Sequence, residues 1–229
     1  TNTFVDGQTA SAAEVNQNFS AIVAGVNAIV RKDDALSNTA IGLTALTRST
    51  TGTFNTASGI EALLNNTEGN SNTANGGYAL SANTTGSSNT ASGVQALYNN
   101  ITGNNNTASG NAALYSNTGG GRNTAIGASA LRTNTNGVQN TAIGYEALKA
   151  SGGGQNTAIG AGSLESNEAG NWNVAVGTFA GFFSSGSENT YVGGRAGDSL
   201  TTGSKGTAIG YGADFGSTDP VNATAIGWN

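Results

Sequence analysis

The sequence has no cysteine, no histidine and no methionine, a single proline, and only 9% charged residues. Without cysteine or histidine, the chain can form neither disulfides nor thiolate or imidazole metal sites, and Ser-His and Cys-His catalysis are excluded. A histidine pH switch is excluded as well. Glycine, in contrast, supplies 36 of the 229 residues, which is too many for an ordinary globular core. We therefore expect a fold whose stability depends on regularity.

The charged residues are few and scattered. The net charge is -5, and the eight Lys and Arg residues form no basic stripe, so nucleic acid is not expected as a partner. No apolar run approaches the roughly 20 residues that span a bilayer, so we expect no membrane insertion by this segment. The 13 Asp and Glu residues form no recurrent pair, which argues against a glycosidase couple and against calcium-binding repeats. The composition predicts no catalytic residues, no metal site and no cofactor.

A pentapeptide related to Asn123-Thr124-Ala125-Ile126-Gly127 recurs along most of the chain. Its copies begin at residues 38, 55, 72, 89, 106, 123, 140, 156, 173, 189, 206 and 223. The period is 17 residues and shortens to 16 twice. Numbering each repeat from the start of the motif, position 1 is Asn in ten of twelve copies, position 3 is Ala in eleven, and position 5 is Gly in all twelve. This regularity indicates a stacked solenoid.

Each repeat divides into apolar segments and a polar loop. The motif predicts a short strand with Thr and Ile on one face and Asn, Ala and Gly on the other. An Ala-Leu pair at positions 8 and 9, such as Ala62-Leu63, predicts a second short strand. The loop carries a Gly, such as Gly69 or Gly86, that we expect to adopt positive φ. We expect parallel pairing of successive turns, with Ile and Leu columns left exposed on a monomer and buried between copies of the chain.

The N-terminal part has a different pattern. Residues 1–10 show no period and are expected to form a cap, whereas Ser11 and Glu14 fit a helix capping box. The apolar residues that follow have heptad spacing, which predicts a short trimeric coiled coil and junction over residues 11–37. The predicted seam consists of Val15, Phe19, Ile22, Val26 and Ile29, and residues 31–34 are expected to close the helix. The alternative is a single amphipathic helix packed on the first repeat.

The repeated NTAIG motif with its Ala-Leu partner resembles the head of trimeric autotransporter adhesins of the Yersinia-adhesin type, over residues 38–227. That resemblance implies a trimeric left-handed parallel β-roll. The segment Phe4-Val5-Asp6-Gly7, together with residues 12–19, is similar to the opening of phage tail-fibre proteins and of related secreted fibres, including those of predatory bacteria. The expected fold is therefore an all-β solenoid, a trimeric left-handed parallel β-roll of 17-residue repeats preceded by a short α-helical coiled coil.

Position 4 of the repeat changes character along the chain. It is Ile or Val in most copies, but four consecutive copies carry Ser58, Asn75, Ser92 and Ser109. If this face points at the three-fold axis that the resemblance implies, these polar groups are buried and need partners. We then expect ordered water or anions at these layers, or a local widening of the trimer. The alternative is that this part of the face is solvated.

From residue 171 the repeats loosen and aromatic residues become frequent. Position 9, which is Leu in most repeats, becomes Gly181, Gly197 and Asp214. The aromatic residues could fill the space left by the missing Leu side chains, or they could form an exposed patch that contacts a sugar or a protein. The candidate recognition residues are Trp172, Phe179, Phe182 and Phe183.

Taken together, these features predict a homotrimeric, non-enzymatic structural segment of a surface or tail fibre. It would lie outside the cell, on a bacterial surface or a phage virion, and would present an adhesive or receptor-binding tip. Because the chain stops after a motif at residue 229, we expect residues 38–229 to be a roll truncated at its C-terminus. The alternatives are an adhesin that binds a host-cell glycan or protein through the roll itself, a polysaccharide-degrading spike, and an ice-binding protein with a Thr array.

Overall fold

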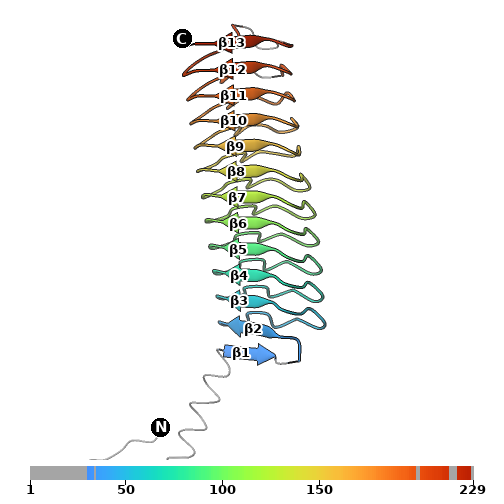
Figure 1. Ribbon diagram of the computed structural model, residues 1–229. Coiled ribbons are helices and arrows are strands. Elements are labelled where there is room, and N and C mark those ends of the chain that lie inside the picture. Colours follow the sequence, from blue (N-terminus) through green and yellow to red (C-terminus); the bar gives the residue numbers. More distant parts are fainter. Residues whose placement is uncertain (1–29, 34, 200–201, 217–220, 228–229) are drawn as a thin grey trace, which may run out of the picture.

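The computed structural model describes residues 30–33, 35–199, 202–216 and 221–227, which form a β-solenoid with one strand in each turn (Figure 1). Its thirteen strands make one sheet, in which each strand lies beside the next one in the sequence. The strands are β1 (Val30–Asp33), β2 (Asn38–Ile41), β3 (Thr56–Ser58), β4 (Thr73–Asn75), β5 (Thr90–Ser92), β6 (Thr107–Ser109), β7 (Thr124–Ile126), β8 (Thr141–Ile143), β9 (Thr157–Ile159), β10 (Val174–Val176), β11 (Thr190–Val192), β12 (Thr207–Ile209) and β13 (Thr224–Ile226).

Strands β2 to β13 pair in parallel, with identical motif positions opposite one another. Thr56 pairs with Thr73, and Ala57 pairs with Ala74. The same register holds across the 16-residue repeats, where Ala142 pairs with Ala158. The prediction of a parallel all-β solenoid with this period is therefore confirmed, and the deleted residues fall in the loops, where they leave strand pairing intact.

The N-terminal edge of the sheet corrects one prediction. Residues 31–33 were expected to close a helix, but with Val30 they form β1, which pairs antiparallel with β2 and places Val30 opposite Ile41. An antiparallel strand at this position occupies the backbone N–H and C=O groups on the free edge of β2, which would otherwise be open to pairing with another chain. The predicted cap and the coiled-coil seam from Val15 to Ile29 lie outside the described residues.

The Ala-Leu pair does not form the predicted second strand. The Leu residue at position 9 adopts left-handed φ values, 51° at Leu63 and 52° at Leu97, and lies in a turn. Its side chain nevertheless points inward, and both Leu residues are fully buried. Burying one Leu side chain stabilises the fold by about 2 kcal/mol, which offsets the cost of about 1 kcal/mol for its backbone conformation. The Leu column is thus buried within one chain. Both the Leu and the Ile columns were expected to be exposed on a monomer, and only the Ile column is exposed.

The Asn residues at position 1 of the motif form a first column of polar side chains in the interior. They lie on the same face as the motif Ala, as the sequence predicted. Asn55 is fully buried. Its backbone N–H donates to Asn38 Oδ1 at 2.8 Å, and its side-chain Nδ2 donates to the carbonyl of Gly69 at 2.8 Å. Asn55 Oδ1 in turn accepts from the backbone N–H of Asn72 in the next turn at 2.9 Å. Because these buried polar groups are paired, they avoid the desolvation cost of an unpaired amide.

A second buried Asn column stands at position 12 and was not predicted. It includes Asn66, Asn83, Asn100, Asn117 and Asn134. Asn100 Nδ2 donates to Asn83 Oδ1 at 2.7 Å and to the Gly103 carbonyl three residues on. The column is interrupted by Ser151 and Ser184 in the two 16-residue repeats, where the loop Gly follows after two residues. A shortened loop cannot hold the Asn side chain in this geometry, and within the described residues Asn134 Oδ1 has no hydrogen-bond partner.

The loop glycines are required for a different reason from the one predicted. Their φ values are not positive, whereas the motif Gly at position 5 has positive φ, as at Gly93 with 136°. A Cβ atom on Gly103 would lie 2.4 Å from both Asn100 Oδ1 and the carbonyl oxygen of Gly120. Close approach between turns, and not backbone conformation, therefore excludes a side chain here.

We predict that Gly103→Ala lowers the free energy of unfolding by about 3 kcal/mol, because the added methyl group forces two turns apart. The control is Gly77→Ala, where the nearest atom to the new Cβ is the Ile60 side chain at 3.3 Å. That variant should change stability by less than about 0.5 kcal/mol. Urea denaturation followed by circular dichroism measures both, and equal effects of the two substitutions would contradict this packing argument.

Candidate functional site

The outer face of the sheet carries an apolar column over six adjacent strands. Positions 2 and 4 point outward, while the Ala between them is buried, as at Ala125 in β7. From β7 to β12, position 4 is a β-branched apolar residue with between 37% and 42% of its surface exposed. The apolar column consists of Ile126, Ile143, Ile159, Val176, Val192 and Ile209. This contiguous exposed apolar surface is a candidate interaction site.

The four predicted polar layers lie on this same outer face. Ser58, Asn75, Ser92 and Ser109 occupy position 4 in β3 to β6, next to the apolar column. On the other side, Ile41 in β2 is again apolar and 43% exposed. In a single chain these polar side chains face outward, so burial at a trimer axis and binding of water or anions stay predictions.

The structure separates the four predicted recognition residues into two places. Trp172 lies in the loop before β10 and is 59% exposed. The three phenylalanines lie in the turn after β10 and contact one another. Phe179 and Phe182 have ring centroids 5.4 Å apart at an interplanar angle of 78°, and Phe182 and Phe183 have centroids 4.6 Å apart at 90°. The three phenylalanines form one edge-to-face cluster, and Trp172 is not part of it.

The phenylalanine cluster lines an open pocket of about 280 Å³. The sequence predicted the phenylalanines as recognition residues but not the rest of the pocket. Its other lining residues, Arg195 and Asp198, come from the following turn. They occupy positions 7 and 10 of their repeat, the positions held one turn earlier by Phe179 and Phe182. The shared repeat positions could have indicated this pocket from the sequence, because residues at the same position in successive repeats lie one turn apart on the same side of the solenoid.

A buried tyrosine shows that the phenylalanines are not needed to fill the core. Position 9 is Gly181 and Gly197 instead of Leu, while position 3 of β11 is Tyr191 instead of Ala. A Cβ atom on Gly181 would lie 2.5 Å from the Tyr191 ring, and one on Gly197 would lie 2.3 Å from it. The fully buried Tyr191 ring therefore occupies the space of two missing Leu side chains. The space-filling interpretation applies to Tyr191, whereas Phe179 and Phe183 are exposed at the surface.

The Tyr191 hydroxyl is also paired inside the core. It lies 2.8 Å from Ser184 Oγ, the residue that interrupts the second Asn column. Burial strongly raises the pKa of Tyr191 because the phenolate would be desolvated, and the charge of Asp214 acts in the same direction. The hydrogen bond with Ser184 opposes this shift only in part.

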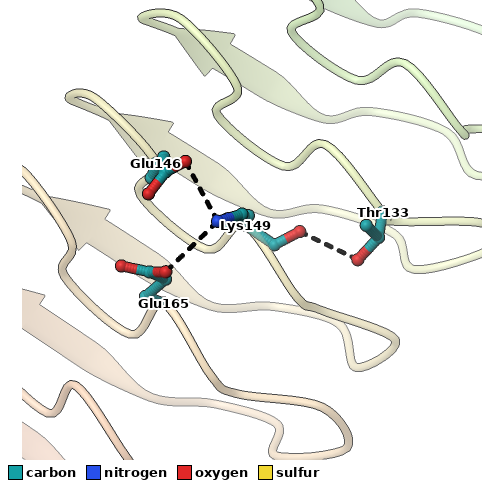
Figure 2. Close-up of polar contacts among 4 residues, drawn as sticks. All are labelled: Thr133, Glu146, Lys149 and Glu165. Atoms are coloured by element: carbon teal, nitrogen blue, oxygen red, sulfur yellow. Dashed lines mark hydrogen bonds and ion pairs between the residues drawn. The ribbon is translucent and has the colours of Figure 1, made fainter.

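A charged cluster joins three successive turns just before the first shortened loop (Figure 2). Lys149 Nζ lies 3.0 Å from Glu146 Oε1 and 3.5 Å from Glu165 Oε1, and Thr133 Oγ1 donates to the Lys149 carbonyl at 2.9 Å. The hydrogen bond to Glu146 is the main cause that raises the pKa of Lys149, and partial burial opposes it. Because lysine separates the two carboxylates, this arrangement is a bridge between turns and not a general acid-base pair.

Position 10 of the repeat carries large side chains in several consecutive turns, including Tyr98, Tyr115, Arg132 and Phe182. Tyr98 and Tyr115 stack with ring centroids 5.2 Å apart at 8°, and the Arg132 guanidinium carbon lies 5.8 Å from the Tyr115 ring centroid. The ring faces that stack on each other are closed to a ligand. At the same position, Phe182 contacts Phe179 and Phe183 and lines the pocket.

Comparison with known proteins adds no relative. The chain matches no protein-family model, no curated protein and no solved structure. Within the part of the chain that the structure describes, no helix is long and apolar enough to cross a membrane. The same residues contain no group of three or more acidic side chains placed to hold a metal ion. The family assignment therefore stays at the level of a parallel β-solenoid.

We predict that Tyr191→Phe changes the alkaline pH dependence of stability. The folded chain keeps this hydroxyl protonated, whereas the unfolded chain releases its proton near pH 10, so the stabilisation is present below pH 10 and falls as the pH rises above it. Tyr191→Phe should lose about 1 kcal/mol at pH 8, with the hydrogen bond to Ser184, and should show a smaller decline above pH 10. Urea denaturation from pH 8 to about pH 11.5 measures this.

The matched control is Tyr145→Phe, a substitution at a 60% exposed position. It should follow the wild-type profile at every pH, and any contribution from Lys149 cancels because all three proteins retain that residue. Parallel profiles for wild type and Tyr191→Phe would contradict the assignment of the alkaline effect to this buried hydroxyl.

Proposed function

We propose that this chain is a non-enzymatic structural segment of a trimeric surface or tail fibre. In this proposal three left-handed solenoids pack around one axis outside the cell, and the segment presents an adhesive or receptor-binding tip. The observation that carries the proposal is the apolar column on the outer sheet face. Three-fold symmetry and handedness come from the resemblance to adhesin heads, and the exposed apolar column supports self-association.

The apolar column would be unfavourable on a single chain in water. Each of its six side chains keeps between 37% and 42% of its surface exposed. Covering that remainder contributes on the order of 1 kcal/mol per side chain. The column lies on the regular sheet, where copies of the same face can meet over several strands without rearrangement. Packing against copies of the chain therefore accounts for the apolar residues at this repeating position.

The sequence along position 4 favours parallel over antiparallel packing. The polar layers in β3 to β6 are displaced toward one end of the stack from β2 to β13. In a parallel, in-register assembly, Ser58 and Ser92 face their own copies, and apolar layers face apolar layers. In an antiparallel assembly about the centre of the stack, Ser58 would face Ile209, and each polar layer would meet an apolar one. Unpaired polar groups against apolar surface are costly.

The regular stack also suits a spacer. Twelve parallel strands at a spacing of about 4.8 Å extend over roughly 55 Å. Hydrogen bonds between backbone groups and between buried Asn side chains connect each turn to the next over this length. A body held together by contacts between neighbours along one axis resists bending, as a fibre segment must.

We predict that the full chain has a solution mass near three times its chain mass of 22.5 kDa. Ile159→Lys should shift the mass toward that of one chain, because a charge in the middle of the apolar column cannot be buried without a partner. Thr85→Lys, at an exposed loop position, is the control and should leave the mass unchanged. Light scattering measures all three, and a wild-type chain that remains monomeric would overturn the proposal.

A second prediction concerns orientation, and the absence of cysteine makes it simple to test. Ser92→Cys should be joined to its own copy in high yield by a short thiol cross-linker, because parallel packing brings like layers together. A mixture of Ser58→Cys and Ile209→Cys chains should form few mixed products, since only antiparallel packing places those positions opposite each other. Efficient mixed cross-linking without Ser92 cross-linking would contradict parallel packing.

A further inference from the structure

We propose that the pocket of Phe179, Phe182, Phe183, Arg195 and Asp198 binds a neutral hexose, such as a terminal sugar of a surface glycan. This proposal does not rest on the fibre assembly. The pocket is built from the turns after β10 and β11, whereas the apolar column stands on the strands themselves.

The aromatic wall of the pocket is exposed without a structural need. Phe183 is 54% exposed and Phe179 is 39% exposed. The core beneath them is already filled by Tyr191, which meets the glycines at the two Leu positions. Three adjacent phenylalanine rings at the surface of a chain with only seven phenylalanines are therefore a concentrated apolar patch.

The wall is also held in place before any ligand arrives. A Cβ atom on Gly162, in the preceding turn, would lie 2.5 Å from the Phe179 ring, so that ring rests directly on the glycine. The edge-to-face contacts then fix Phe182 against Phe179 and Phe183 against Phe182. Rings fixed in this way lose little conformational freedom when a ligand binds, which favours recognition.

The two charged residues supply polar groups beside this wall. Arg195 and Asp198 form no salt bridge with each other or with any other described residue. A guanidinium donates hydrogen bonds in a planar fork, and a carboxylate accepts from two hydroxyl groups. A binding pocket with mostly apolar walls and a few polar groups is typical of a small-molecule site.

A neutral hexose matches this combination better than other small ligands. One face of a pyranose ring presents C–H groups that can lie on an aromatic ring, while its edges present hydroxyl groups for Arg195 and Asp198. The pocket of about 280 Å³ is large enough for one sugar ring and small for a longer ligand. Asp198 repels the carboxylate of an acidic sugar and offsets its attraction to the Arg195 guanidinium, so an acidic sugar has no net electrostatic advantage in this pocket.

The test is a titration of the full chain with galactose, glucose, mannose and N-acetylglucosamine, and with glucuronic acid as the acidic sugar. Saturation-transfer NMR reports contact and competition reports affinity. We expect at least one neutral sugar to bind with millimolar affinity, and Phe183→Ala and Arg195→Gln each to weaken it at least tenfold. Asp198→Asn should weaken the neutral sugar and reduce discrimination against glucuronic acid.

The matched control is Phe54→Ala, which removes an exposed phenylalanine that is 66% exposed and outside the pocket. It should bind the sugar as wild type does, and circular dichroism should show every variant folded. Failure of all neutral sugars to bind up to about 50 mM would overturn the proposal. Stronger binding of glucuronic acid, or equal binding by the pocket variants, would overturn it as well. Light scattering of the same samples reports the fibre proposal separately.

Discussion

Hydrogen bonding between identical side chains in successive turns is the constraint on which this structure depends. Asn100 Nδ2 donates to Asn83 Oδ1 and to the loop carbonyl of its own turn. At position 1 of the motif, the backbone N–H of Asn55 donates to Asn38 Oδ1 and its side-chain Nδ2 donates to the Gly69 carbonyl. A buried amide is tolerated only when the neighbouring turn supplies its partner, so interior positions cannot vary independently. The same constraint leaves no room for a loop side chain, and it explains why a chain with so little bulky apolar content can form a core.

Departures from the repeat come with compensating changes in the same region. Each one-residue deletion in a loop coincides with replacement of the position-12 Asn by Ser. The second of these serines pairs with Tyr191, whose ring replaces two Leu side chains. The Lys149 bridge spans the turns beside the first deletion. The interior therefore behaves as a coupled system, in which a change at one position is accommodated by changes one turn away.

The proposed functions depend on positions that the interior leaves free. Position 4 faces outward on the strand, and positions 7, 10 and 11 face outward on the turn, so their side chains can change without breaking the ladders. The apolar column uses position 4, where repetition along the stack creates a long surface suited to copies of the same chain. The phenylalanine pocket uses the turn positions of two neighbouring repeats only, which suits a small ligand. In these proposals, assembly and local recognition use separate surfaces of one scaffold.

Period, strand position and the inward face of the motif followed from the sequence, because a 17-residue repeat with Gly at every position 5 has few ways to stack. Local patterns failed where a distant contact decides the conformation. Val30 to Asp33 form a strand because β2 offers an open edge, and Leu97 takes a turn conformation because the interior accepts its side chain. Asn100 looked like any loop residue, and only stacking shows it to be buried. The pocket, too, exists only because two turns place Phe182 and Asp198 side by side.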